Sequence, residues 1–283
     1  MTALFIGVVS HANSRFLVSQ GPLGLGAQVA DRLRAGGMTV AVQVNTADLH
    51  DPPSMPVTRA TVQASLTAQL RLDRRWSAYL AGFVGPAWWA RHGLRWLRRV
   101  EQSVRSPEPR TVERLLNIEL SHLDLLRTGR ASGAAWVLVL EDDAASVDLD
   151  DLVSGLLGLM ACGPAQPAFV NVSQSFTAAE LGIAHLLSPV LGATWSGSVD
   201  RRILAASRPV TNTVCAILYR ATLLDALLTE WDALPIDPVI PIDWKLNEVL
   251  MGMFEAGALG HGDCWQVDPG PIDQLSMRPA VPS

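Results

Sequence analysis

Several features that define other protein classes are scarce or missing in this chain of 283 residues. Lys245 is its one lysine, and the formal net charge of −5 argues against nucleic-acid binding, which needs a basic surface. The three cysteines are odd in number and lack C-x-x-C spacing, which predicts reduced thiols of a cytoplasmic protein rather than a disulfide or zinc framework. No apolar run approaches the roughly 18–20 residues that span a bilayer, and residues 1–10 lack the basic start of a secretory signal.

Two enzyme motifs are also missing. No G-x-S-x-G occurs, so nothing supports a serine hydrolase of that type. Residues 21–26 are glycine-rich, but their spacing fits neither G-x-G-x-x-G nor a Walker sequence. We therefore interpret this segment as a flexible loop and disfavour a Rossmann dehydrogenase.

What is present predicts an ordered α/β protein. Apolar residues make up 49% of the chain and charged residues 17%, which indicates a substantial core. The chain opens with a strand at 4–9, a helix at 24–35 and a strand at 38–44, and this order favours a parallel sheet with ligands beyond the carboxyl ends of its strands. We predict further strands at 136–140, 169–172 and 213–219, helices at 109–127, 148–160, 221–230 and 244–254, and a loop over 173–212.

The most informative feature is an apolar strand that ends in three acids, Glu141-Asp142-Asp143. The preceding residues 136–140 are β-branched and leucine-rich, as in a fully buried central strand. Three adjacent carboxylates repel one another, and a hard cation such as Mn²⁺ or Mg²⁺ relieves that repulsion. Strand alternation predicts that Glu141 and Asp143 point to one side and Asp142 to the other.

A segment rich in tryptophan and arginine, residues 71–100, stands apart from the rest. A Gly-Pro pair at 85–86 divides it into two predicted helical pieces, within a helical insertion over residues 60–108. Tryptophan beside arginine suits the interface of an anionic membrane, which would make the protein peripheral at the inner membrane face. Packing of the tryptophans on the protein body or on a second subunit explains the same pattern, and both explanations stay open here.

The order of several motifs resembles a known family. Ser121-His122 lies on a predicted helix, Leu140-Glu141-Asp142-Asp143 ends a strand, Asp243 opens a helix, and Asp273-Gln274-Leu275-Ser276 comes near the end. This order over residues 110–276 resembles the GT-A type nucleotide-sugar glycosyltransferases, and most closely the lipooligosaccharide glycosyltransferase family (family 25). The resemblance implies a GT-A-like fold, with a Rossmann-type, mainly parallel sheet flanked by helices. The chain departs from the family pattern in residues 10–16, after the first strand, and in residues 117–120, before the Ser-His pair.

The resemblance also implies a mechanism. A cation held by Asp143 and the donor's phosphates would neutralise the charge that forms on the diphosphate leaving group. Glu141 or Asp142 would contact the ribose or a metal-bound water, and Ser10 and Arg15 would contact the donor after the first strand. Arg15 is equally well explained as an ordinary surface arginine.

The remaining candidates each have a structural alternative. Asp243 is the candidate general base of an inverting reaction, or an N-cap without chemistry. His261 is the candidate third metal ligand, or an incidental loop histidine. His122 is expected to be structural and to brace the acidic strand. Lys245 is expected to be a solvated helix lysine, with a contact to a phosphate or a carboxylate as the alternative.

We therefore expect a single domain over 1–283 that acts as a cytoplasmic glycosyltransferase of the hexosyltransferase class in cell envelope glycan synthesis. Its donor would be a nucleoside-diphosphate sugar, with a UDP-sugar as the first choice. Its acceptor would be a glycan, a lipid-linked molecule or a small molecule, and no nucleic-acid partner is expected. A nucleotidyltransferase also uses acids at strand ends, but it would be expected to show a basic glycine-rich loop, which residues 21–26 do not provide. A non-catalytic binding protein of the same fold is the other alternative.

Overall fold

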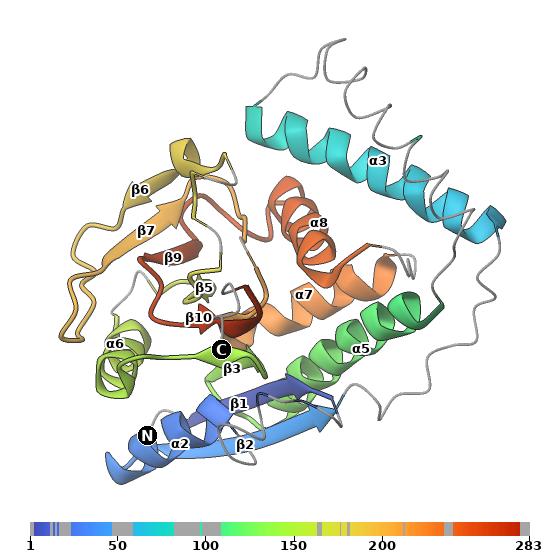
Figure 1. Cartoon of the computed structure of the whole chain (residues 1–283). Coiled ribbons are helices and arrows are strands. Elements are labelled where there is room, and N and C mark those ends of the chain that lie inside the picture. The colour runs from blue at the N-terminus through green and yellow to red at the C-terminus, as the bar shows by residue number, and fades with distance from the viewer. Residues whose placement is uncertain are drawn as a thin grey trace, which may run out of the picture.

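The structure is a computed structural model that describes residues 3–11, 14, 16, 24–46, 59–81, 97, 109–162, 166–175, 177–179, 182–211, 213–234 and 240–277. In chain order its elements are β1 (Ala3–Ser10), α2 (Gly24–Ala35), β2 (Thr39–Thr46), α3 (Arg59–Ala81), α5 (Pro109–Ala131), β3 (Trp136–Glu141), β4 (Ala144–Ala145), α6 (Leu149–Ala161), β5 (Phe169–Asn171), η2 (Ala184–Leu186), β6 (Leu187–Pro189), β7 (Arg202–Ala206), β8 (Ala216–Arg220), α7 (Ala221–Ala233), α8 (Ile242–Glu255), β9 (Cys264–Asp268), β10 (Asp273–Gln274) and η3 (Leu275–Met277). Figure 1 shows their arrangement.

The described strands form one large sheet of eight strands, in the order β2-β1-β3-β8-β5-β9-β7-β6. Strands β2, β1, β3, β5, β9 and β6 run in one direction, and β8 and β7 run against them. The α/β class and a mostly parallel central sheet are thus confirmed, although two antiparallel strands make the sheet mixed. A second, two-stranded sheet joins β4 to β10.

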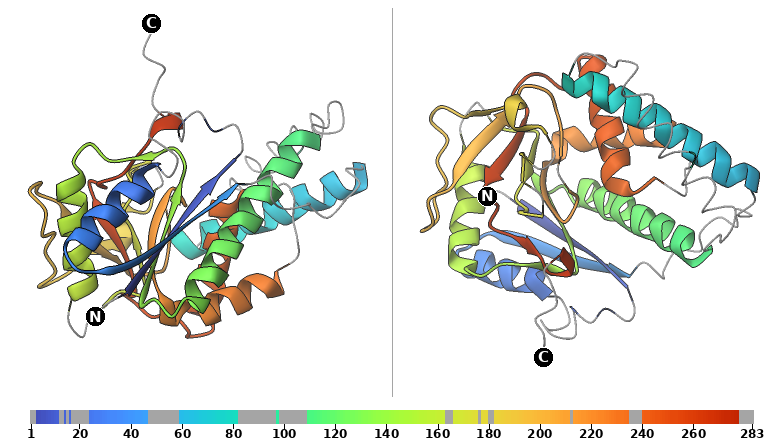
Figure 2. Two further views of the ribbon diagram at one scale, coloured as in Figure 1. Left: turned by 90° about the horizontal axis from the view of Figure 1, so that it is seen from below. Right: turned by 45° about the horizontal axis from the view of Figure 1, so that its top comes forward.

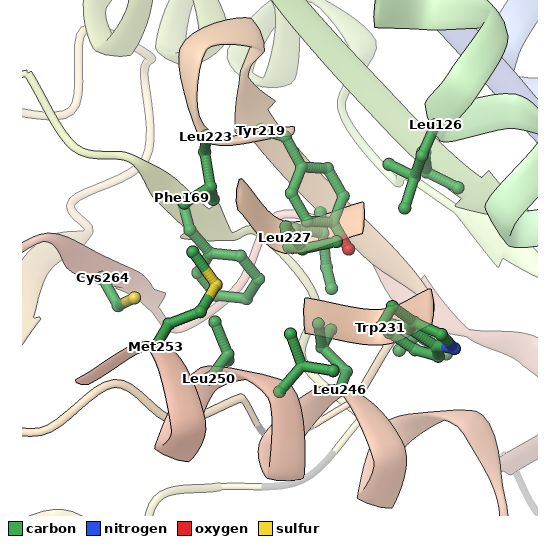
Figure 3. Close-up of a cluster of buried hydrophobic side chains, with 14 of the residues drawn as sticks. Leu126, Phe169, Tyr219, Leu223, Leu227, Trp231, Leu246, Leu250, Met253 and Cys264 are labelled. Carbon is green, nitrogen blue, oxygen red and sulfur yellow. The ribbon is translucent and has the colours of Figure 1, made fainter. Parts of the chain in front are cut away.

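Helices cover both faces of the sheet (Figure 2, left). Alternate residues of each buried strand face opposite layers, as strand geometry requires. Leu138 and Leu140 of β3 pack in the core formed with α2 and α6, whereas Val137 and Val139 pack in the core formed with α5, α7 and α8. Side chains of the second core gather around Phe169 in Figure 3.

Helix α3 packs on α8, and its aromatic residues are part of that contact. The Trp76 ring stacks on Tyr79 at 6.2 Å between ring centroids and meets Trp244 edge-on at 6.1 Å. Arg75 pairs with Glu255 of α8 at 2.6 Å. In this part of the Trp/Arg segment the packing explanation therefore accounts for the aromatic residues. Residues 82–96 and 98–108, with most of the tryptophans, lie outside the described residues.

Two sequence predictions need correction. The segment predicted as a loop over 173–212 contains β6 and β7, and β7 pairs with the unpredicted strand β9. Helix α8 begins at Ile242 with Pro241 at the N-cap, so Asp243 lies in the first turn and is not the N-cap itself. None of the described helices is both long and apolar enough to cross a membrane.

Candidate active site at the carboxyl edge of the sheet

The three acids lie where the central parallel strands end. Glu141 closes β3 opposite Val9 of β1, and the chain then turns through Asp142 and Asp143 into β4. The Leu275 amide donates to the Asp143 carbonyl at 2.9 Å, and β10 pairs with β4 beside it. The C-terminal segment thus closes over the turn, and the acids are held at the edge where α/β sheets bind ligands.

Asp142 faces the end of β1. The Ser10 hydroxyl donates to Asp142 Oδ2 at 3.0 Å, and His11 Nε2 lies 3.9 Å from the same oxygen. The candidate donor residues Ser10 and Asp142 are therefore brought together. Arg15 lies outside the described residues.

Glu141 faces α5, as the predicted alternation requires. His122 Nε2 lies 3.7 Å from Glu141 Oε1, and the Gln274 amide donates to Glu141 Oε2 at 3.1 Å. His122 is only 3% exposed, and its Nε2 has no hydrogen-bond partner in the described structure. The motifs Ser121-His122 and Glu141-Asp142-Asp143, distant in sequence, thus meet at one place.

Asp143 is the most buried of the three acids, at 5% exposed. Ser276 hydrogen-bonds the carboxylate, while Oδ1 has no partner among the described residues. Burial raises the pKa of Asp143, the Ser276 hydrogen bond lowers it, and the charges of Glu141 and Asp142 raise it further, so that the net shift is upward. A buried acceptor without a donor is costly unless a ligand supplies the missing contact.

Asp243 enters from the first turn of α8, on the α5 side of the sheet. Burial raises the pKa of its carboxyl, hydrogen bonds from the Trp244 and Asp243 amides lower it, and the Glu141 charge raises it. Of the three acids, it is therefore Glu141 whose charge acts on Asp243. A carboxyl with a raised pKa is a stronger base than an exposed aspartate, as general-base catalysis near neutral pH requires.

A polar network fixes the start of α8 against the sheet. Asn247 Oδ1 accepts from the Thr211 amide at 2.9 Å, and the Asn171 amide group donates to Thr211 Oγ1 at 2.9 Å. Asn247 also donates to the Asp243 carbonyl at 3.1 Å. This network ties Asp243 to the end of β5.

Lys245 is buried, which contradicts the expectation of a solvated helix lysine. It is 2% exposed, and its Nζ lies 2.5 Å from Glu119 Oε2 of α5. Trp231 of α7 donates to the other Glu119 oxygen at 3.0 Å. Through Glu119, Lys245 therefore links α8 to α5 and α7, and its buried ammonium group is not available to a phosphate.

His261 is not brought to the acids. His261 lies before the first residue of β9, whereas the acids follow the last residues of β3. Because β3 and β9 run in the same direction, these positions are at opposite edges of the sheet. Its Nδ1 contacts the Ser207 carbonyl, and its ring meets Phe254 edge-on at 5.2 Å. His261 is exposed and lies at the edge of the sheet opposite to Asp143, so it is not placed to bind a cation beside Asp143.

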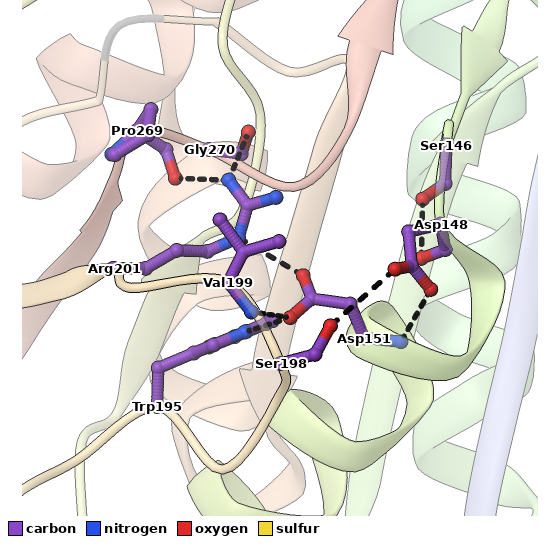
Figure 4. Close-up of polar contacts among 9 residues, drawn as sticks. All are labelled: Ser146, Asp148, Asp151, Trp195, Ser198, Val199, Arg201, Pro269 and Gly270. Atoms are coloured by element: carbon purple, nitrogen blue, oxygen red, sulfur yellow. Dashed lines mark hydrogen bonds and ion pairs between the residues drawn. The ribbon is translucent and has the colours of Figure 1, made fainter.

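A buried ion pair supports the segment that closes the site (Figure 4). Arg201 Nε lies 3.0 Å from Asp151 Oδ2, and its Nη1 donates to the carbonyls of Pro269 and Gly270 at 2.7 and 3.0 Å. Trp195 Nε1 donates to Asp151 Oδ1 at 3.1 Å. Arg201 thus anchors the turn that leads into β10 and Gln274. Trp195 and Arg201 fall in the segment predicted as a loop, and the sequence does not mark them as site-supporting residues because their partners are distant in the chain.

The donor set fits a divalent cation. Glu141, Asp143 and Cys215 each offer one atom, and these atoms lie within 4.8 Å of one another. Two carboxylates suit Mg²⁺ or Mn²⁺, and the unpartnered Asp143 oxygen leaves a coordination position open to a cation.

No protein-family model matches the chain, and no curated protein sequence matches it.

Proposed function

We propose that the chain is a metal-dependent glycosyltransferase of the GT-A type, which moves a sugar from a nucleoside-diphosphate sugar to a hydroxyl group of an acceptor. The observation that carries the proposal is the buried Asp143 carboxylate, whose unpartnered oxygen lies in a cluster with Glu141 at the carboxyl edge of the sheet. A cation held there by Asp143 and Glu141 supplies charge neutralisation for the departing diphosphate.

The neighbouring residues divide the other tasks. Ser10 holds one oxygen of Asp142 and orients the carboxylate toward a ribose hydroxyl of the donor. Gln274 holds Glu141 in the same way from the C-terminal segment. Both carboxylates are thus positioned before a ligand arrives, which lowers the ordering cost of binding.

Asp243 is the base that takes the proton of the acceptor hydroxyl, with an inverting outcome. The acceptor is a glycan, a glycolipid or a small molecule with a free hydroxyl.

The test is a panel of UDP-, GDP- and dTDP-sugars incubated with Mn²⁺, in which release of nucleoside diphosphate and sugar transfer are followed. We expect turnover with at least one donor, its loss on chelation, and its loss in Asp143→Ala. Asp150→Asn is the matched control, because Asp150 is an exposed acid of α6, and it should keep wild-type turnover.

The same assay separates the alternatives. Release of pyrophosphate from a nucleoside triphosphate and a sugar phosphate would indicate a nucleotidyltransferase instead. Donor binding without any turnover across the acceptor panel would indicate a binding protein.

A further inference from the structure

Cys215 places a thiol inside the acidic cluster. It precedes β8, which lies next to β3, and its carbonyl accepts from the Glu141 amide at 2.8 Å. Ligand atoms of Glu141, Asp143 and Cys215 lie within 4.8 Å of one another, which is close enough for one ion to contact all three.

The sulfur is buried in a polar setting. The hydroxyl groups of Ser175 and Ser173 lie near the thiol, and these two hydroxyls are 2.8 Å from each other. Burial raises the pKa of Cys215 most, and the charges of Glu141 and Asp143 raise it further, while the two serines lower it. Without a cation the thiol is therefore protonated, and its serine neighbours are placed to stabilise a thiolate once a cation is present.

Two other buried atoms point to a ligand at this place. Asp143 Oδ1 and His122 Nε2 both lack a hydrogen-bond partner in the described structure, and both residues are more than nine-tenths buried. His122 Nε2 also lies 3.7 Å from Glu141 Oε1, so it faces the cluster. Unsatisfied buried polar atoms are uncommon in folded proteins, and an ion bound by the cluster would give Asp143 Oδ1 the partner it lacks.

We propose that Cys215 is the third protein ligand of the cation site, so that the site takes a borderline cation such as Co²⁺ or Zn²⁺ in preference to Mg²⁺. The inference rests on the proposed function for the presence of a cation, and adds its chemical class. On binding, a metal–sulfur bond forms as the S–H bond breaks, and the proton leaves to solvent. Thiolate favours softer cations, whereas Mg²⁺ gains only the two carboxylates.

The test is a titration of the purified protein with Co²⁺, followed by near-ultraviolet absorption, where a thiolate ligand gives a sulfur-to-cobalt charge-transfer band. We expect the band in the wild type and its loss in Cys215→Ser, with Co²⁺ affinity reduced at least about tenfold, the lower end of the cost of perturbing a metal site. Mg²⁺ affinity should change far less. Cys162→Ser is the matched control, because Cys162 lies at the end of α6, outside the cluster, and it should keep the band.

Each outcome decides the inference. Co²⁺ binding without the band, with Mn²⁺-dependent turnover intact, overturns the role of Cys215 and leaves the proposed function standing. No binding of any divalent cation overturns both. If Cys215→Ser does not fold, a band retained in both Cys162→Ser and Cys264→Ala assigns it to Cys215, and its loss in either variant contradicts that assignment.

Discussion

Lys245 Nζ lies 2.5 Å from Glu119 Oε2, and this buried pair joins α8 to α5. Glu119 is one turn from His122, which faces Glu141, and Lys245 follows Asp243 by two residues. The pair thus holds the helix that carries the candidate base against the helix that braces the acidic strand. A buried pair of this kind specifies an arrangement more than it adds stability, because desolvation offsets much of the attraction.

Lys245→Met should therefore destabilise the protein by about 3–5 kcal/mol, since it leaves Glu119 charged and buried without its partner. The double variant Glu119→Gln with Lys245→Met should recover most of that loss, because glutamine is neutral and still accepts from Trp231. Urea unfolding of the three proteins measures the difference. A double variant no more stable than Lys245→Met would show that the buried charge is not the cause.

Asp143→Asn should stabilise the cation-free protein at neutral pH by on the order of 1 kcal/mol, because it removes a buried charge that two other acids repel. The pKa of Asp143 is raised in the folded protein, so the folded state holds this proton more tightly than the unfolded chain. The protonated Asp143 carboxyl therefore makes its full contribution to the free energy of unfolding below the pKa of the unfolded chain. That contribution is lost as pH rises through the pKa of the folded protein.

Thermal unfolding against pH, in the presence of a chelator, checks the Asp143 prediction. The advantage of Asp143→Asn should grow as pH rises from the ordinary carboxyl range and vanish in acid. Equal pH profiles for the two proteins would contradict the raised pKa. With Mn²⁺ the order should reverse, because the cation stabilises only the wild type.

Asp243→Asn should lower kcat by roughly 100-fold or more and leave donor binding unchanged, as expected for loss of a general base. The pKa of Asp243 is raised, so the wild-type rate should fall as pH drops through that pKa, starting at a higher pH than for an exposed aspartate. Steady-state kinetics across pH provides the measurement. Wild-type turnover in the variant would remove Asp243 from the mechanism.

Arg201→Met should destabilise the protein by about 3 kcal/mol or more, because Asp151 is left buried and charged. It should also weaken Mn²⁺ binding, since Arg201 anchors the turn before Gln274 and Ser276. Arg202→Met is the control, because its pair with Asp268 is largely exposed, and little change is expected. The same loss in both variants would mean that the buried pair has no special role.

Local pattern was enough to predict the acidic edge. The apolar run before Glu141 marked β3, and alternation placed Glu141 and Asp142 on different sides, where they meet His122 and Ser10. The strand and the acids that end it depend on neighbours in sequence and could therefore be predicted without a structure, whereas the contacts with His122 and Ser10 join segments that are far apart in the chain.

The missed features depend on partners far along the chain. Lys245 and Glu119 are 126 residues apart, so nothing near Lys245 marked it as buried. Strand β7 is short and lies in a serine- and proline-rich stretch, whose composition does not predict a strand. The strand is stabilised by its pairing with β9. Cys215 showed no metal-ligand spacing, and only the pairing of β8 with β3 brings its thiol to the acids.

Mn²⁺ binding by titration calorimetry, compared between the wild type, Asp143→Ala and Asp150→Asn, tests the central claim most directly. A cation held by the acids at the end of β3 predicts saturable binding in the wild type and in Asp150→Asn, and its loss in Asp143→Ala. Equal Mn²⁺ affinity in all three proteins, or no binding in any of them, would contradict it.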